Sequence, residues 1–136
     1  MAAKTWVLTD VAEQEYLDSF QVTAKDIAGA PDGLEISKRT LQGGLSEGVD
    51  VVRLNNGKLT VEVLPTRGMS LWKAWSGDDV IGWDSPVRGP VHPSLVDLGE
   101  PSGLGWLDGF DELLVRCGLE SNGAPEFNEQ GQLAYT

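Results

Sequence analysis

The sequence has few of the residues on which metal and redox sites depend. Its 136 residues include one cysteine, Cys117, and one histidine, His92. A single cysteine excludes an intrachain disulfide and a multi-thiolate metal site. No second imidazole or thiolate is available at ligand spacing, so a zinc-type site is disfavoured as well. We therefore expect no bound metal and a fold that side-chain packing stabilises.

Basic residues and long apolar runs are also scarce. Ten Lys and Arg residues stand against 21 Asp and Glu residues, which gives a net charge of −11, and the basic residues form no cluster. This balance argues against nucleic acid and against an anionic membrane surface as partners. No window approaches the ~18 apolar residues of a membrane helix, and the N-terminus lacks the apolar core of a signal peptide. We expect a cytoplasmic protein.

The residues that are present predict one domain with a short N-terminal appendage. The chain is 40% apolar, and a protein of this length can bury roughly two-thirds of its unfolded surface. Asp10 followed by Glu13 fits a capping box, which predicts a short helix over residues 10–20. Glycine and proline then interrupt the chain. We expect residues 1–33 to form a helical appendage and linker, and residues 34–136 to form the domain.

From Leu34 onward the pattern is typical of β-strands. Apolar and polar residues alternate over 34–37, 49–51 and 58–63, which places one apolar face inward. The Asn56-Gly57 pair between the last two runs suits a tight hairpin turn. A second pair of strands is predicted within 70–83, around the turn residues Ser76 to Asp79. The sequence therefore predicts a mainly β fold built from antiparallel strands.

The second half of the chain contains a long irregular segment. Residues 85–105 are rich in Pro and Gly, and such excursions inside compact domains tend to carry function. Residues 106–113 are predicted to form one or two helical turns, followed by a buried strand over 114–119. Leu133 and Tyr135 are typical of a strand that is just beginning. We expect the chain to be part of a longer protein.

Aromatic rings and carboxylates gather in this second half. Aromatic planes cover the apolar C–H faces of sugars, and carboxylates accept hydrogen bonds from sugar hydroxyls. A helical turn would bring three carboxylates to one face beside the rings. The alternative is that the rings only fill the core. The residues concerned are Trp72, Trp75, Trp83, Trp106, Asp108, Phe110, Asp111 and Glu112.

Three further residues have both a functional and a structural interpretation. Arg67, in a turn set by proline and glycine, can present a planar fork of donors to a ligand, or can form an internal salt bridge. Ser46 lies in a Gly-x-Ser-x-Gly pattern, but no helix follows it, so a loop is favoured over a hydrolase nucleophile. His92 could act as an acid or base, although a lone loop imidazole is usually a surface residue.

Three motifs resemble one known family. Residues 64–69 (Leu-Pro-Thr-Arg-Gly-Met), 105–110 and 114–119, the last followed by Gly123 and Pro125, are similar to the N-terminal part of an aldose 1-epimerase-like family of unknown function. That family belongs to the galactose mutarotase-like superfamily. The resemblance implies antiparallel sheets of a β-supersandwich, with a hexose or related sugar bound in a cleft. The motif positions that it implies for sugar binding are Arg67, Trp106, Asp111 and Cys117.

The resemblance also implies an activity and its limits. Mutarotases of this superfamily open the sugar ring with a histidine acid and a glutamate base, without a cofactor, and both residues lie on later strands than those present here. We therefore assign no catalytic residue and expect these 136 residues to be inactive alone. An unfinished sheet would expose an edge through which copies could pair.

Two other functions remain open. A noncatalytic carbohydrate-binding module would need only the aromatic platform and its polar rim. A glycoside hydrolase would need two carboxylates across a bond. Asp108 with Asp111 or Glu112 fits that requirement poorly, because neighbours on one turn face the same way.

Overall fold

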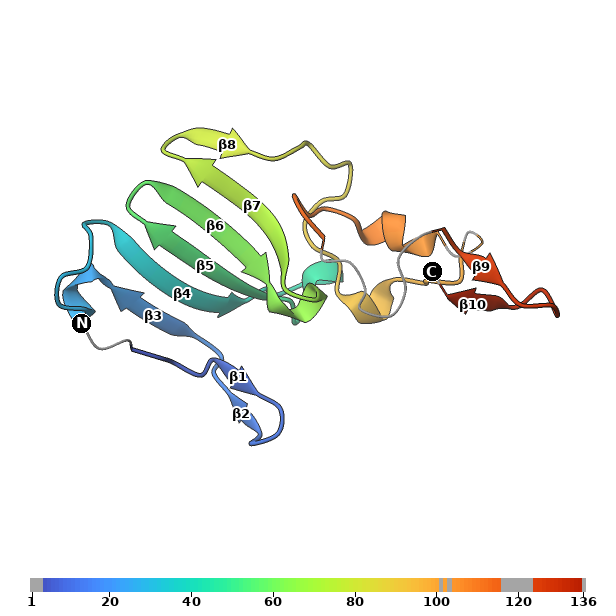
Figure 1. The fold of residues 1–136 in the computed structure, drawn as a ribbon, viewed down its shortest axis with the longest axis horizontal. Helices are drawn as coiled ribbons and strands as arrows, with labels where there is room; N and C mark the ends of the chain where they lie inside the picture. The colour runs from blue at the N-terminus through green and yellow to red at the C-terminus, as the bar shows by residue number, and fades with distance from the viewer. Residues whose placement is uncertain (1–3, 101, 103, 116–123, 136) are drawn as a thin grey trace.

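A computed structural model describes residues 4–100, 102, 104–115 and 124–135, and its centre is a six-stranded antiparallel sheet. The strands follow one another in chain order, so each pairs with its sequence neighbours (Figure 1). This arrangement confirms the predicted mainly β, antiparallel fold. The strands are β3 (Phe20–Thr23), β4 (Leu34–Thr40), β5 (Asp50–Asn56), β6 (Leu59–Leu64), β7 (Ser70–Ser76) and β8 (Asp79–Ile81).

Both predicted hairpin turns are present. Between β5 and β6, the side chain of Asn55 accepts a hydrogen bond from the backbone N–H of Gly57 at 2.7 Å. Gly57 has a φ of 88°, and a Cβ there would lie 2.1 Å from the carbonyl oxygen of Asp32. Gly77, with a φ of 59°, turns the chain between β7 and β8. Glycine meets both requirements because it lacks a Cβ.

The predicted N-terminal helix is wrong. Two short strands, β1 (Thr9–Asp10) and β2 (Glu15–Tyr16), pair antiparallel instead. The Asp10 carboxylate accepts hydrogen bonds from the backbone N–H groups of Ala12 and Glu13, as a cap would, but Gln14 has a φ of 56°. That left-handed residue reverses the chain after one turn, so no helix follows.

The sheet also begins earlier than the sequence predicts. Strand β3 pairs with β4, which adds a strand from the 1–33 segment to the same sheet. The buried Lys38 side chain on β4 donates to the carbonyl oxygen of Leu17 at 2.6 Å and pairs with Asp50 at 3.0 Å. The hydrogen bond to Leu17 attaches the N-terminal segment to the sheet. The division of the chain at residues 33 and 34 stays a prediction.

The two faces of the sheet differ in character. One face, here called the aliphatic face, is defined by Leu34, Ile36, Val52, Leu54, Leu59, Val61, Val63 and Leu71. A groove of about 440 Å³ runs along it, and Leu54 and Leu59 are exposed. The opposite face, here called the polar face, carries Arg39, Arg53, Glu62, Lys73 and Trp75.

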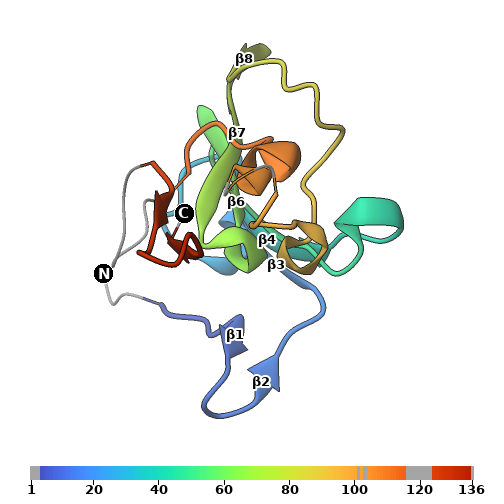
Figure 2. The same ribbon diagram turned by 90° about the vertical axis from the view of Figure 1, so that its right-hand side faces the viewer.

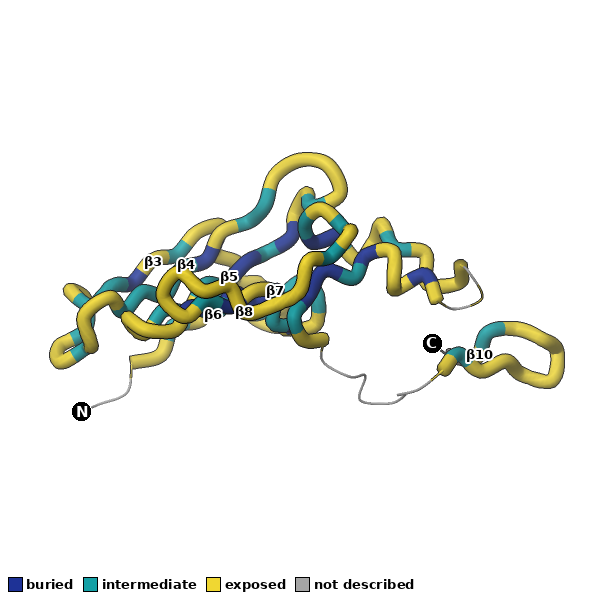
Figure 3. Tube along the Cα trace, turned by 90° about the horizontal axis from the view of Figure 1, so that it is seen from above, coloured by how far each residue is buried: buried dark blue, intermediate teal, exposed yellow. Residues whose placement is uncertain are grey.

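The small core lies at the loop end of the polar face. Val49, Val51 and Leu64 are fully buried there, and Leu41 and Trp72 pack against them. Figure 3 shows that the buried residues concentrate where the sheet meets the loops. This end of the sheet therefore supplies the rigid support for the residues that follow.

The irregular excursion predicted for residues 85–105 is present and is longer than predicted, because it begins after β8 and runs over residues 82–115. Two short 3₁₀ helices interrupt it, η4 (Pro93–Leu95) and η5 (Gly105–Gly109). The helical prediction for 106–113 is therefore confirmed only in part, because η5 ends at Gly109 and Phe110 is extended. Leu114 forms a β-bridge with Leu71, whereas most of the predicted strand 114–119 lies outside the described residues.

A separate hairpin ends the described chain. It consists of β9 (Glu126–Phe127) and β10 (Leu133–Tyr135), which confirms the predicted strand at Leu133 and Tyr135. Figure 1 shows this hairpin apart from the six-stranded sheet, and Figure 2 views the molecule from the hairpin's end. Among the described residues, no helix is long and apolar enough to cross a membrane.

Candidate functional site

A cavity of about 310 Å³ lies where the end of β6 meets the excursion. It brings together two of the four predicted sugar-binding residues, Arg67 and Trp106. The cavity is lined by Thr66, Arg67, Gly68, Pro93, Val96, Leu98, Trp106, Glu112 and Val115.

A short 3₁₀ helix, η3 (Pro65–Arg67), places Arg67 in this cavity. Pro65 occupies the first helical position, and Gly68 ends the helix in the left-handed conformation with a φ of 65°. The hydroxyl of Thr66 accepts a hydrogen bond from the backbone N–H of Asp50 at 2.9 Å, which ties the turn to β5. The Pro-Thr-Arg-Gly order therefore fixes the position from which the arginine extends.

Arg67 forms an internal ion pair and also lines the cavity. Its Nε donates to Oε1 of Glu112, and its Nη1 donates to the carbonyl oxygen of Val91 at 2.6 Å. The side chain of Arg67 is 13% exposed and that of Glu112 is 1% exposed. The salt bridge was one of the two interpretations of Arg67, and it leaves part of the guanidinium at the cavity wall.

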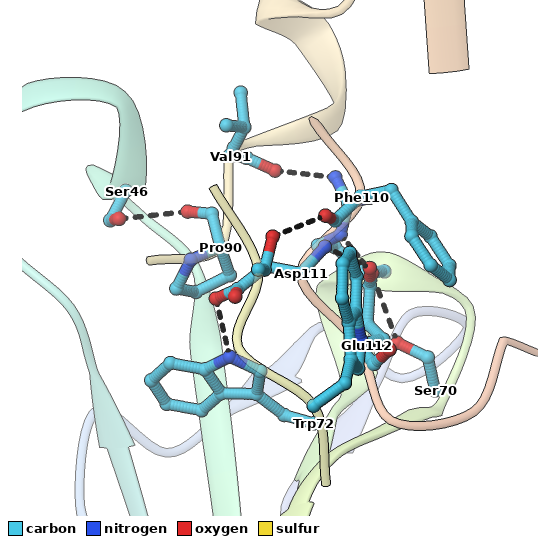
Figure 4. Close-up of polar contacts among 11 residues, drawn as sticks. Ser46, Ser70, Trp72, Pro90, Val91, Phe110, Asp111 and Glu112 are labelled. Carbon is cyan, nitrogen blue, oxygen red and sulfur yellow. Dashed lines mark hydrogen bonds and ion pairs between the residues drawn. The ribbon is translucent and has the colours of Figure 1, made fainter. Parts of the chain in front are cut away.

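Glu112 is held by further hydrogen bonds from the chain around it. Its Oε1 accepts from the hydroxyl of Ser70 at 3.3 Å, and its Oε2 accepts from the backbone N–H of Asp111 at 3.0 Å (Figure 4). The sequence interpretation grouped Glu112 with carboxylates that accept hydrogen bonds from sugar hydroxyls. It missed the pairing with Arg67, because 45 residues separate the two and no local pattern connects them.

Asp111 lies beside the cavity and does not line its wall. Its Oδ2 accepts a hydrogen bond from the indole Nε1 of Trp72 at 2.8 Å, and the residue is 9% exposed (Figure 4). Asp108, within η5, is exposed. The three carboxylates therefore do not share one face of a helical turn, because η5 ends at Gly109, before the last two of them.

The aromatic residues divide between the cavity and other packing. The Trp106 ring lines the cavity, is 40% exposed and meets Phe110 edge-on at 5.7 Å. Trp83 packs against Phe110 at 5.5 Å and donates to the carbonyl oxygen of Glu112 at 3.0 Å. Trp72 packs on the core and Trp75 lies below Arg53. The core-filling interpretation therefore holds for Trp72, whereas the platform role of Trp106 stays a prediction.

The remaining candidates have structural partners or lie outside the described residues. The Ser46 hydroxyl donates to the carbonyl oxygen of Pro90 at 2.7 Å, and no helix follows it. The His92 ring contacts the hydroxyl of Ser94 at 2.8 Å. Cys117 lies outside the described residues. Within the described part of the chain, no three His, Cys, Asp or Glu residues are grouped so that they could hold a metal ion.

The described cavity wall combines apolar surface with one balanced pair of charges. Trp106, Val96, Leu98 and other apolar residues supply most of it, while Arg67 and Glu112 carry opposite charges. Such a wall can cover the C–H face of a ligand and donate hydrogen bonds to its oxygen atoms.

Comparison with known proteins places this fold in a family. Residues 46–135 match the family described as "Domain of unknown function (DUF4432)". The structure superimposes on the crystal structure of a "putative aldose 1-epimerase" from Klebsiella pneumoniae with a TM-score of 0.89 and 36% sequence identity. The match covers 97% of this chain and 34% of that one, so the chain spans about a third of its length.

A comparison with curated proteins found no match. The family model nevertheless covers more than half of the chain, and the structural match confirms the resemblance inferred from the three motifs. The chain therefore belongs to the family described as a domain of unknown function, DUF4432, and has an aldose 1-epimerase-like fold.

Proposed function

We propose that this chain forms one wall of a sugar-binding site in an aldose 1-epimerase-like protein, which in its complete form interconverts sugar anomers. The observation that carries the proposal is the meeting of Arg67 and Trp106, which are far apart in the sequence, at one cavity of about 310 Å³. The similarity to the Klebsiella pneumoniae protein supports the same reaction class. No cofactor is required for that chemistry.

Each proposed binding residue has a distinct task. The Trp106 ring covers a C–H face of the sugar, and the Arg67 guanidinium donates hydrogen bonds to hydroxyl or ring oxygen atoms. Asp111 acts by holding Trp72 through its indole hydrogen bond. Cys117, in the third motif, stays a proposed contact. An acid and a base would open the ring, rotation about C1–C2 would exchange the anomeric face, and closure would follow.

The acid and base of this reaction are not assigned to described residues. Glu112 is engaged by Arg67, and the His92 ring contacts Ser94 outside the cavity. We therefore expect the 136-residue chain to bind sugars without catalysing mutarotation. We also propose a cytoplasmic location, and the net charge of −11 argues against nucleic acid and membrane partners.

Saturation-transfer NMR with D-galactose and D-glucose tests the binding, and polarimetry tests the reaction. We expect saturation transfer to the sugar protons with the wild-type chain and its loss with Trp106→Ala. The Trp75→Ala variant is a matched control, because Trp75 lies on the polar face below Arg53. Equal signals from both variants would contradict the proposed site. Mutarotation by the chain alone, with the Klebsiella protein as reference, would contradict the expected absence of catalysis.

A noncatalytic carbohydrate-binding module is the second candidate. It needs only an exposed ring beside a hydrogen-bond donor, and Trp106 and Arg67 provide both at the cavity. Tight binding of an oligosaccharide by the chain, with no mutarotation by its Klebsiella relative, would favour this alternative.

A further inference from the structure

Glu112 is a buried carboxylate within the proposed sugar site. Its role there is inferred on the basis of the function proposed above. Its side chain is 1% exposed, although Glu112 is one of the residues that line the cavity. A buried carboxylate is tolerated where charge and hydrogen bonds compensate it. Arg67 supplies the opposite charge, and Ser70 and the backbone of Asp111 supply hydrogen bonds.

Glu112 determines how the Arg67 guanidinium is oriented. It occupies the Nε side of the guanidinium, while the carbonyl oxygen of Val91 accepts from Nη1. Because a guanidinium is planar, two fixed contacts define the plane of the whole group. Nη2 makes no hydrogen bond with any residue that the structure describes, so its donors are available to a ligand at the cavity wall.

Glu112 also determines the net charge of this wall. Arg67 and Glu112 are the charged residues among the described lining, and they form one pair. An unpaired arginine in such a cavity would attract phosphate and carboxylate groups. With its charge balanced, the same guanidinium still donates hydrogen bonds to neutral oxygen atoms.

We propose that Glu112 is the positioning and specificity-determining residue of this cavity. It aims the free side of Arg67 at a neutral sugar and cancels the charge that would otherwise favour a phosphorylated or acidic sugar. On this basis the carboxylate touches no substrate and acts only through Arg67.

The test compares Glu112→Gln with a matched variant elsewhere in the sheet. Glutamine keeps the size of the side chain and removes its charge. Glu62→Gln makes the same change on the polar face, where the Glu62 side chain is 5% exposed and pairs with Arg39 at 3.0 Å and Arg53 at 3.4 Å. Glu62 does not line the cavity. Both variants have the same net charge, so long-range charge effects are matched.

Binding of D-glucose, D-glucose 6-phosphate and inorganic phosphate is followed by NMR titration of the Arg67 Nε–H signal. We expect Glu112→Gln to bind phosphate and glucose 6-phosphate about tenfold or more tightly than the wild type, with a salt dependence that the wild type lacks. Glucose affinity should not rise. Glu62→Gln should leave the ratio of anionic to neutral affinity unchanged.

Equal phosphate affinity in the wild type and Glu112→Gln would overturn the inference. A gain in phosphate affinity without glucose binding by either protein would support the role of Glu112 and contradict the proposed sugar-binding function separately. If Glu112→Gln does not fold, the wild type alone decides: tighter binding of glucose 6-phosphate than of glucose overturns the inference, and weaker binding supports it.

Discussion

At the scale of single residues, Arg67 shows which features of the site depend on neighbouring residues in the sequence alone. The Pro-Thr-Arg-Gly order predicts a turn that projects an arginine, and η3 confirms it. The pairing of Arg67 with Glu112 depends on the path of the excursion, so no local pattern predicted it. The sequence left open whether Arg67 contacts a ligand or forms a salt bridge. Both are compatible, because one guanidinium has several donors.

Replacement of Arg67 by alanine is expected to destabilise the fold. The change leaves the buried Glu112 carboxylate without its charge partner, which typically costs about 3–5 kcal/mol. Urea denaturation followed by tryptophan fluorescence measures the loss. Arg88→Ala is the control, because Arg88 is exposed and should change stability by less than about 0.5 kcal/mol. Similar stabilities for the two variants would contradict the importance of the pair.

The pKa of the exposed Asp26 carboxyl is expected to lie below the ordinary aspartate value. The backbone N–H of Thr23 donates to it at 2.8 Å and lowers its pKa, and the hydroxyl of Thr23 at 2.9 Å lowers it further. Because the folded pKa is depressed, the contribution of Asp26 to stability is present above its unfolded pKa and is lost as pH falls through the folded pKa.

Carbon-detected NMR titration of the aspartate carboxyls measures this pKa. Thr23→Ala should raise the pKa toward its ordinary value in part, because the backbone hydrogen bond remains. An Asp26 pKa at or above the ordinary aspartate value in the wild type would contradict the two hydrogen bonds from Thr23.

At the scale of elements, the turn residues predicted their hairpins correctly, whereas the residues typical of a helix start did not predict a helix that forms. Asn56-Gly57 predicts its hairpin because the required backbone angles are available locally to these residue types. Asp10 and Glu13 fit a helix start, yet Gln14 ends the turn in the left-handed region. A cap satisfies only the first backbone groups, and the packing of the following residues decides whether a helix continues.

Gly57→Ala is expected to weaken the β5–β6 hairpin. The residue has a φ of 88°, and an added Cβ would meet the carbonyl oxygen of Asp32 at 2.1 Å, so the loss should exceed about 1 kcal/mol. Thermal denaturation compares it with Gly82→Ala, where no atom lies within 4 Å of the new Cβ. An unchanged melting temperature for Gly57→Ala would show that the turn relaxes freely.

At the scale of the whole molecule, the exposed surface is larger than the mass predicts. The accessible surface is 9,485 Å², whereas the scaling of surface with mass gives about 6,900 Å² for a folded monomer of 14.6 kDa. The aliphatic face contributes to this excess, because its groove of about 440 Å³ is open. Apolar surface of this kind associates readily in water.

We therefore expect the isolated chain to bind a hydrophobic dye and to self-associate. Val61→Lys, on the aliphatic face, should reduce both effects, as measured by dye fluorescence and sedimentation velocity. Val80→Lys is the control, because Val80 is exposed and pairs with Trp75, on the opposite face. A monomeric wild type without dye binding would contradict the prediction. An effect of Val80→Lys alone would point to the edge strand β8 instead.

The sequence by itself determined the β class, the two hairpins and the family, because period-two alternation, Asn-Gly turns and short motifs are local properties of neighbouring residues. Tertiary structure decided that β3 extends the sheet, that Asp111 holds Trp72 and that Arg67, Trp106 and Glu112 line one cavity. These outcomes depend on contacts between residues that are distant in the chain. Such contacts form, and stabilise the fold, only when the sheet and the excursion pack together.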